Sequence, residues 1–227
     1  MDEDIPADLH DFENINEEAQ EGVTIVEVLN EMKKVWEFER VSPLLLPHRL
    51  ELVDVLVNEL DKLEKGMAEA KKAGVAGKNE IVGARKYEVA RVRYIINSYL
   101  RCRLQKIERN PADVMARHLE ANEKGHADLL DAHEVTFTEN IVRSNCNYFN
   151  QSFLGLLPPG LDKPVVSKDR SELKRCFVKV HKHVNVNIFK MDDPNSDNAV
   201  ILETGTTHYL PFYSISEHLN DDSVGLL

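Results

Sequence analysis

The sequence predicts a mostly α-helical domain of about five helices in a bundle-like arrangement, followed by a small β-rich domain. The 227 residues include only 10 glycines and 9 prolines, which is below average usage and favours long helices. Apolar residues recur at intervals of three and four as far as about residue 157, and alternate in short runs after it. We therefore predict a helical domain over 23–160, a linker over 161–173 and a β-rich domain over 174–227.

The first residues differ sharply in charge from the rest. The chain has a formal net charge of -11, yet residues 1–22 contain nine acidic side chains and no Lys or Arg, so the remainder is nearly neutral. We predict a disordered acidic tail over 1–22. Ile5, Leu9 and Phe12 have the spacing of one face of a short helix that could dock in a partner groove; the alternative is a solvated terminus.

Composition excludes several classes of protein. An acidic chain is a poor general binder of DNA or of an acidic membrane surface. No run approaches the ~20 apolar residues of a membrane span, so no membrane partner is expected. Three cysteines stand far apart in the sequence, which argues against a disulfide framework or a Cys-based zinc site and suggests a reducing compartment: Cys102, Cys146 and Cys176.

Local signals define the first three helices. Thr24 and Glu27 form a capping box that predicts a helix from there to Ser42-Pro43. Pro47 stands where a second helix would begin, and that helix is expected to run to about Ala73. The third is expected over about residues 79–109. It carries apolar residues on more than one side, so we expect it to be buried on more than one side.

Two arginines lie on or beside the main apolar stripe of this third helix. Arg103 falls in its middle and Arg93 at its edge. A buried arginine needs carboxylate or carbonyl partners, so three readings stay open: a charge that reaches solvent at the domain edge, an ion pair within a bundle or across a subunit contact, or nucleic-acid contact. The candidate partner-interface or ion-pair residues are Arg93, Tyr94, Tyr99, Leu100 and Arg103.

Local signals also predict the helices and strands after residue 110. A short helix is expected over about 112–122, and Asp131 with Glu134 predicts a capped helix that continues to Leu157. Alternation and turn residues then predict strands over 176–184, 186–191, 199–203 and 208–213, with a short helix near 216–219.

No motif of phosphate binding, serine hydrolysis or metal hydrolysis occurs in the sequence. His181 and His183 would share one face of the strand over 176–184, where an exposed strand face explains them better than a metal site does. We therefore predict no enzyme activity, no catalytic residues, no metal and no cofactor.

Two segments are locally basic. Residues 78–109 contain nine Lys or Arg against three Glu, and residues 168–190 contain seven against two acidic residues. Aromatic residues lie among them, so a nucleic-acid-binding adaptor that uses these segments is the alternative function. An acidic partner surface or the acidic tail could bind the same basic residues, and we expect DNA contact to be weak or indirect.

The segment RVRYIINSYLRCRLQKIE over 91–108 closely resembles the signature helix of the Sld-five type of subunit in the GINS complex. The matched positions are Arg91, Arg93, Tyr94, Ser98, Tyr99, Leu100, Arg101, Arg103, Leu104, Lys106, Ile107 and Glu108. The order of parts also agrees over about residues 24–227.

This resemblance implies a non-catalytic structural subunit of a nuclear heterotetramer, with three sibling GINS subunits as partners. It implies that the complex joins the MCM ring and the Cdc-forty-five protein in the CMG helicase, and supports initiation and elongation of DNA replication at the fork. Some members of the family dock on a trimeric replisome adaptor by an N-terminal motif, which makes that adaptor the candidate partner of the acidic tail.

Overall fold

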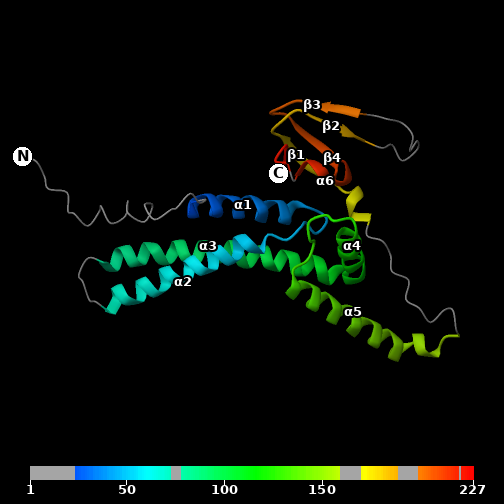
Figure 1. Ribbon diagram of the computed structural model, residues 1–227, viewed down its shortest axis with the longest axis horizontal. Helices are drawn as coiled ribbons and strands as arrows, with labels where there is room; N and C mark the ends of the chain where they lie inside the picture. Colours follow the sequence, from blue (N-terminus) through cyan, green and yellow to red (C-terminus); the bar gives the residue numbers. More distant parts are fainter. Residues whose placement is uncertain (1–23, 73–77, 159–169, 189–198, 220) are drawn as a thin grey trace, which may run out of the picture. The chain divides into compact units, whose positions relative to one another are not determined.

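The computed structural model describes residues 24–72, 78–158, 170–188, 199–219 and 221–227 (Figure 1). Within them, five long helices are followed by five short strands and a short helix, so the predicted fold class is confirmed. The chain forms two compact units. One combines residues before Val35 with Glu51–Ile95, and the other combines Val35–Leu50 with Ile96–Leu227. The division at 161–173 that the sequence suggests stays a prediction.

The first helix, α1, spans Ile25–Val41. Its capping box is confirmed, because the Thr24 backbone N–H donates to Glu27 Oε2 at 2.9 Å and the Glu27 N–H donates to Thr24 Oγ1 at 3.4 Å. An irregular segment follows, and α2 spans Leu50–Lys72. The expectation that Pro47 starts α2 is wrong, since the helix begins three residues later. Gly74 and Gly77, which are expected to end α2, lie outside the described residues.

The third helix, α3, spans Lys78–Arg109 and contributes to both units. Its N-terminal part supplies the first unit, whose core consists of apolar side chains from α1, α2 and α3. The buried members are Val28, Met32, Val53, Leu56, Leu60, Met67, Val89, Val92 and Ile95. Ile95 lies off the main stripe of α3 and is nevertheless buried, as expected for a helix that is apolar on more than one side.

The helices α4, Pro111–Glu123, and α5, Ala132–Ser152, belong to the second unit. Pro111 occupies the first turn of α4, where its missing N–H costs no hydrogen bond. The predicted capping box of Asp131 and Glu134 is present at the start of α5. The helix ends at Ser152 and a 3₁₀ turn follows over Leu154–Leu156, so the expectation of one helix to Leu157 is wrong at its end.

The strands are β1 (Arg175–Val180), β2 (Val184–Asn187), β3 (Ala199–Leu202), β4 (Thr207–Pro211) and β5 (Val224–Leu226), and α6 spans Ser216–Leu219 (Figure 1). They form an antiparallel sheet in the order β4-β1-β5 and a two-stranded antiparallel sheet of β2 and β3.

The expectation of one strand over 176–184 is wrong. The chain leaves β1 after Val180, where the N–H groups of His181 and Lys182 both donate to the carbonyl oxygen of Ser223 at 2.8 and 3.1 Å. β2 begins only at Val184. His181 and His183 therefore lie in the connection between two strands and do not share a strand face.

The core of the β-rich part takes side chains from all five strands and from α6. Its fully buried members include Val178, Val186, Leu202 and Val224. Side chains from the end of α1 and the segment after it also pack against this core, namely Phe38, Val41, Leu44 and Leu46. The approach is close at Gly225, where an added Cβ would lie 2.8 Å from His181 Nε2 and 3.8 Å from Phe38.

Candidate functional site

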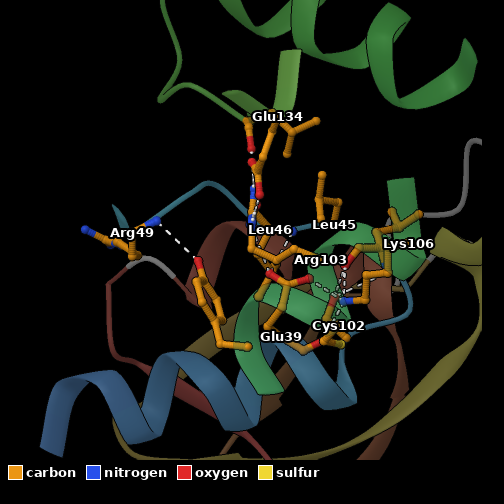
Figure 2. A network of polar contacts seen from close by, with 12 residues as sticks. Glu39, Leu45, Leu46, Arg49, Cys102, Arg103, Lys106 and Glu134 are labelled. Atoms are coloured by element: carbon orange, nitrogen blue, oxygen red, sulfur yellow. Dashed lines mark hydrogen bonds and ion pairs between the residues drawn. The ribbon is translucent and has the colours of Figure 1, made fainter. Parts of the chain in front are cut away.

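A buried polar network surrounds Arg103 in the second unit (Figure 2). Arg103 has no exposed surface. Its guanidinium donates two parallel hydrogen bonds to the Glu134 carboxylate, from Nε to Oε1 at 2.7 Å and from Nη2 to Oε2 at 2.8 Å. The remaining N–H groups reach Glu39 Oε2 at 3.3 Å and the carbonyl oxygens of Leu46 and Leu129, each at 2.8 Å. All five donors of the guanidinium are thus used, which excludes the reading of a charge that reaches solvent.

Glu39 is the second centre of this network and is only 1% exposed. Besides Arg103, it accepts hydrogen bonds from Lys106 Nζ to Oε1 at 2.6 Å and from the Leu46 backbone N–H to Oε2 at 3.4 Å. Lys106 Nζ also donates to the carbonyl oxygen of Leu44 at 2.9 Å. The network therefore connects the end of α1, the segment after it and the C-terminal part of α3.

Glu134 belongs both to the capping box of α5 and to the ion pair with Arg103. It is the third residue of α5, and its Oε2 accepts the Asp131 backbone N–H at 3.2 Å in the capping box. The same carboxylate accepts the two hydrogen bonds from Arg103. The start of α5 is thereby fixed against α3, and loss of the glutamate would disturb both the cap and the ion pair.

The charges of the network balance. Two cations, Arg103 and Lys106, face two carboxylates, Glu39 and Glu134. Burial alone would lower the pKa of Arg103, but hydrogen bonds to Glu134 and the charges of its neighbours outweigh burial, and its pKa lies above the usual value. All four charged groups are engaged with one another, which is typical of a structural element rather than a reaction centre.

Tyr99 lies beside this network. Its side chain has no exposed surface, its hydroxyl accepts the Arg49 backbone N–H at 3.3 Å, and Arg103 Cζ lies 5.7 Å from the ring centroid. Burial raises the pKa of the Tyr99 hydroxyl. Leu100, the next residue, is half-buried. The structure thus brings Tyr99, Leu100 and Arg103 together in one unit.

The other candidate residues lie elsewhere. Arg93 belongs to the first unit, where its Nη2 contacts Glu64 Oε1 at 2.7 Å in an ion pair whose two side chains are 51% and 40% exposed. Tyr94 is 64% exposed in the same unit. The five candidates therefore do not form one cluster. Ile5, Leu9 and Phe12 lie outside the described residues.

Sequence reasoning missed Glu39, named Lys106 only as a matched position of the segment over 91–108, and treated Glu134 only as a cap. A signal for Glu39 exists, because it follows Val35 and Trp36 by four and three positions and so continues the apolar stripe of α1. A carboxylate on an apolar stripe and an arginine on another are complementary. Their pairing could have been proposed from that observation.

The second half of α5 and the turn after it carry a row of exposed apolar side chains. Tyr148 and Phe149 pack edge to face with centroids 5.7 Å apart, and Phe149 and Phe153 do so at 5.8 Å. The exposed fractions are 66% for Tyr148, 40% for Phe149, 49% for Phe153, 87% for Leu156 and 40% for Leu157. We call these five residues the α5 apolar face. Contiguous exposed apolar surface of this kind marks interaction sites.

Comparison with known proteins gives a consistent answer. The chain is 25% identical over 225 residues to the mouse protein named DNA replication complex GINS protein SLD5, which covers 97% of this chain and 98% of that protein. The human protein of the same name is 25% identical over 209 residues, covering 90% and 91%. The Dictyostelium discoideum protein of that name is 25% identical over 189 residues, covering 82% and 84%.

The chain is similar over nearly its whole length to SLD5-type GINS proteins from several species. The resemblance first seen in the segment over 91–108 is thereby confirmed along nearly the whole chain. No family model matches the sequence. Among the described residues, no helix is long and apolar enough to span a membrane. The same part of the chain contains no group of three or more His, Cys, Asp or Glu side chains placed to hold a metal ion.

Proposed function

We propose that this chain is a non-catalytic structural subunit of a GINS-type heterotetramer, and that its partners are three sibling subunits. The observation that carries the proposal is the similarity over 97% of the chain to a protein whose name places it in a GINS replication complex. In this proposal the tetramer acts in the nucleus with the MCM ring and the Cdc-forty-five protein, and supports the CMG helicase during initiation and elongation of replication.

The α5 apolar face is the surface best suited to a sibling subunit. Its rings and leucines offer a hydrophobic patch without a charged side chain among its five members, as in the cores of obligate interfaces. The saturated Arg103 network supports this role, since it fixes the start of the same helix. A sibling subunit with an apolar helix face is the occupant that the proposal specifies.

Co-expression tests this assignment. The chain is produced with its three siblings, and the tetramer is isolated by affinity capture and size-exclusion chromatography. Phe149→Glu/Phe153→Glu places two charges on the α5 apolar face and is expected to abolish capture of at least one sibling, because a buried unpaired charge costs several kcal/mol. Asn147→Glu, exposed on the opposite side of α5, is the matched control and should assemble normally.

Two results would contradict the proposal in different ways. Assembly of the Phe149/Phe153 variant at the wild-type yield would exclude the α5 apolar face as the interface. Failure of the wild-type chain to co-purify with any sibling would contradict the GINS assignment itself. Circular dichroism of both variants checks that neither substitution unfolds the helices.

The acidic tail has a separate proposed role, which is docking on a trimeric replisome adaptor through Ile5, Leu9 and Phe12. A partner groove rimmed by Lys or Arg would offset the cost of ordering so short a helix. A peptide of residues 1–20 should bind the adaptor weakly and lose binding with salt. A Leu9→Ala/Phe12→Ala peptide should not bind. Equal binding by the two peptides, or none by either, would leave the tail without this role.

The alternative adaptor function is partly weakened by the structure. In the segment 78–109, Arg103 and Lys106 are engaged inside the buried network, and Arg93 pairs with Glu64. This segment therefore presents less positive charge than its composition suggests. The segment over 168–190 differs, because its described basic residues on β1 are exposed.

A further inference from the structure

The outer face of the three-stranded sheet presents two aromatic rings side by side. Phe177 on β1 and Tyr209 on β4 are paired residues, with ring centroids 4.8 Å apart and an interplanar angle of 37°. The opposite side of the sheet faces the core, since Cys176, Val178 and Leu210 are buried. Phe177 and Tyr209 remain 57% and 53% exposed. A sheet therefore holds two large rings in place at its surface although neither contributes to the core.

Positive side chains flank the two rings. Arg175 and Lys179 lie two residues to either side of Phe177 on β1, so all three share one face of the strand. Arg175 Cζ is 6.0 Å from the centroid of the Tyr209 ring. Lys179 pairs across the sheet with Thr207. We call Arg175, Phe177, Lys179, Thr207 and Tyr209 the aromatic–basic face; none of these five residues is acidic.

We propose that the aromatic–basic face binds single-stranded nucleic acid. Aromatic rings on adjacent strands of an open sheet offer stacking surfaces for unpaired bases, and a guanidinium and an ammonium beyond the rings are placed for backbone phosphates. An acidic peptide would use the two cations but has no need of two exposed rings. An apolar partner would use the rings but leaves the cations without a role. The combination fits a ligand that is flat, aromatic and anionic.

This site is independent of the α5 apolar face and goes beyond the role of a scaffold subunit. Contact of this size is weak, which agrees with the expectation of weak DNA contact from an acidic chain. The proposed contact is confined to β1 and the adjacent strand β4, and does not involve the basic residues of α3.

Fluorescence anisotropy with a labelled oligothymidylate at low ionic strength tests the site on the full-length chain. Phe177→Ala/Tyr209→Ala is expected to weaken binding roughly tenfold or more, the scale of losing one or two stacked bases. Arg175→Ala/Lys179→Ala should weaken binding and reduce the steepness of its salt dependence. Tyr87→Ala is the matched control: Tyr87 is 81% exposed and lies on α3 within the other basic segment, and its loss should leave affinity unchanged.

A variant that keeps aromatic rings guards against effects of misfolding. Phe177→Tyr/Tyr209→Phe preserves two stacking surfaces and should bind like the wild type, and photo-crosslinks from a wild-type complex should map to β1 and β4. Absence of oligothymidylate binding by the wild-type chain would overturn the proposal. An affinity of the Phe177→Ala/Tyr209→Ala variant equal to that of the wild type would also overturn it. Competition by polyglutamate that depends only on Arg175 and Lys179 would overturn it too, because it would assign the face to an acidic polypeptide. Sibling assembly should be unaffected in every variant, so this test and that of the GINS assignment fail separately.

Discussion

Replacing Arg103 by alanine is the sharpest test of the buried network. The substitution removes five hydrogen bonds and leaves Glu134 and Glu39, which are 8% and 1% exposed, with one cation, Lys106, in place of two. Breaking a buried ion pair from one side costs about 3–5 kcal/mol, because the remaining charge stays buried without its partner. For a chain of this size each kcal/mol lowers the melting temperature by about 2–4 °C, so we expect a decrease of about 10 °C.

Thermal and urea unfolding followed by circular dichroism at the helix band measure this effect. Arg101→Ala is the matched control, since it removes the same side chain from an exposed position two residues away on α3 and should change stability by less than about 0.5 kcal/mol. Arg103→Lys should lie between the two, because an ammonium group cannot form the paired hydrogen bonds to both oxygens of Glu134.

A double substitution separates the ion pair from the packing around it. Arg103→Met/Glu134→Gln removes one cation and one carboxylate together, leaves Lys106 and Glu39 as a balanced pair, and keeps a glutamine that can still form the capping box. We expect it to be more stable than Arg103→Ala. If Arg103→Ala unfolds at the wild-type temperature, or no differently from Arg101→Ala, the buried network does not contribute to the stability of the fold.

Two further predictions concern the same unit. Burial raises the folded-state pKa of Tyr99 above its ordinary value of 10.0, so the protonated hydroxyl stabilises the fold fully below pH 10 and this contribution is lost as the pH rises through the higher folded-state pKa. In Tyr99→Phe the loss of stability between neutral and strongly alkaline pH should therefore be smaller than in the wild type. An identical alkaline melting profile would contradict this. A chain truncated after residue 160 should keep the circular dichroism of its helices but melt at a lower temperature and bind a hydrophobic dye. The reason is that side chains at the end of α1 and after it lose the β core they contact, namely Phe38, Val41, Leu44 and Leu46. An unchanged melting temperature would show that these contacts do not contribute to stability.

Local signals were sufficient for much of the fold. The two capping boxes were predicted because each depends on two residues three positions apart, and both are present. The strand expected over 176–184 failed for a nonlocal reason. Its alternation continues through His181 and His183, but the hydrogen bonds from His181 and Lys182 to Ser223 interrupt the strand. Nothing in the segment itself specifies this partner, which lies 42 and 41 residues further along the chain.

The candidate site shows the same limit. The position of Arg103 on an apolar stripe indicated that the side chain needs a partner, and burial follows from the stripe. Which partner it finds depends on residues 31 and 64 positions away, Glu134 and Glu39. Pairing at such separations is decided by how helices pack, and one sequence gives only complementary charge as a guide.

The three leucines after α1 explain why the network matters beyond its own hydrogen bonds. Their carbonyl oxygens accept Lys106 at Leu44, Arg117 at Leu45 and Arg103 at Leu46. Their side chains divide between two cores: Leu45 is buried with Ile107 and Val114, whereas Leu44 and Leu46 pack against the β core. Movement of this segment would therefore loosen both cores together. Since Arg103 and Lys106 hold its backbone, the α3 signature stabilises the helical and the β-rich parts of this unit through the same three residues.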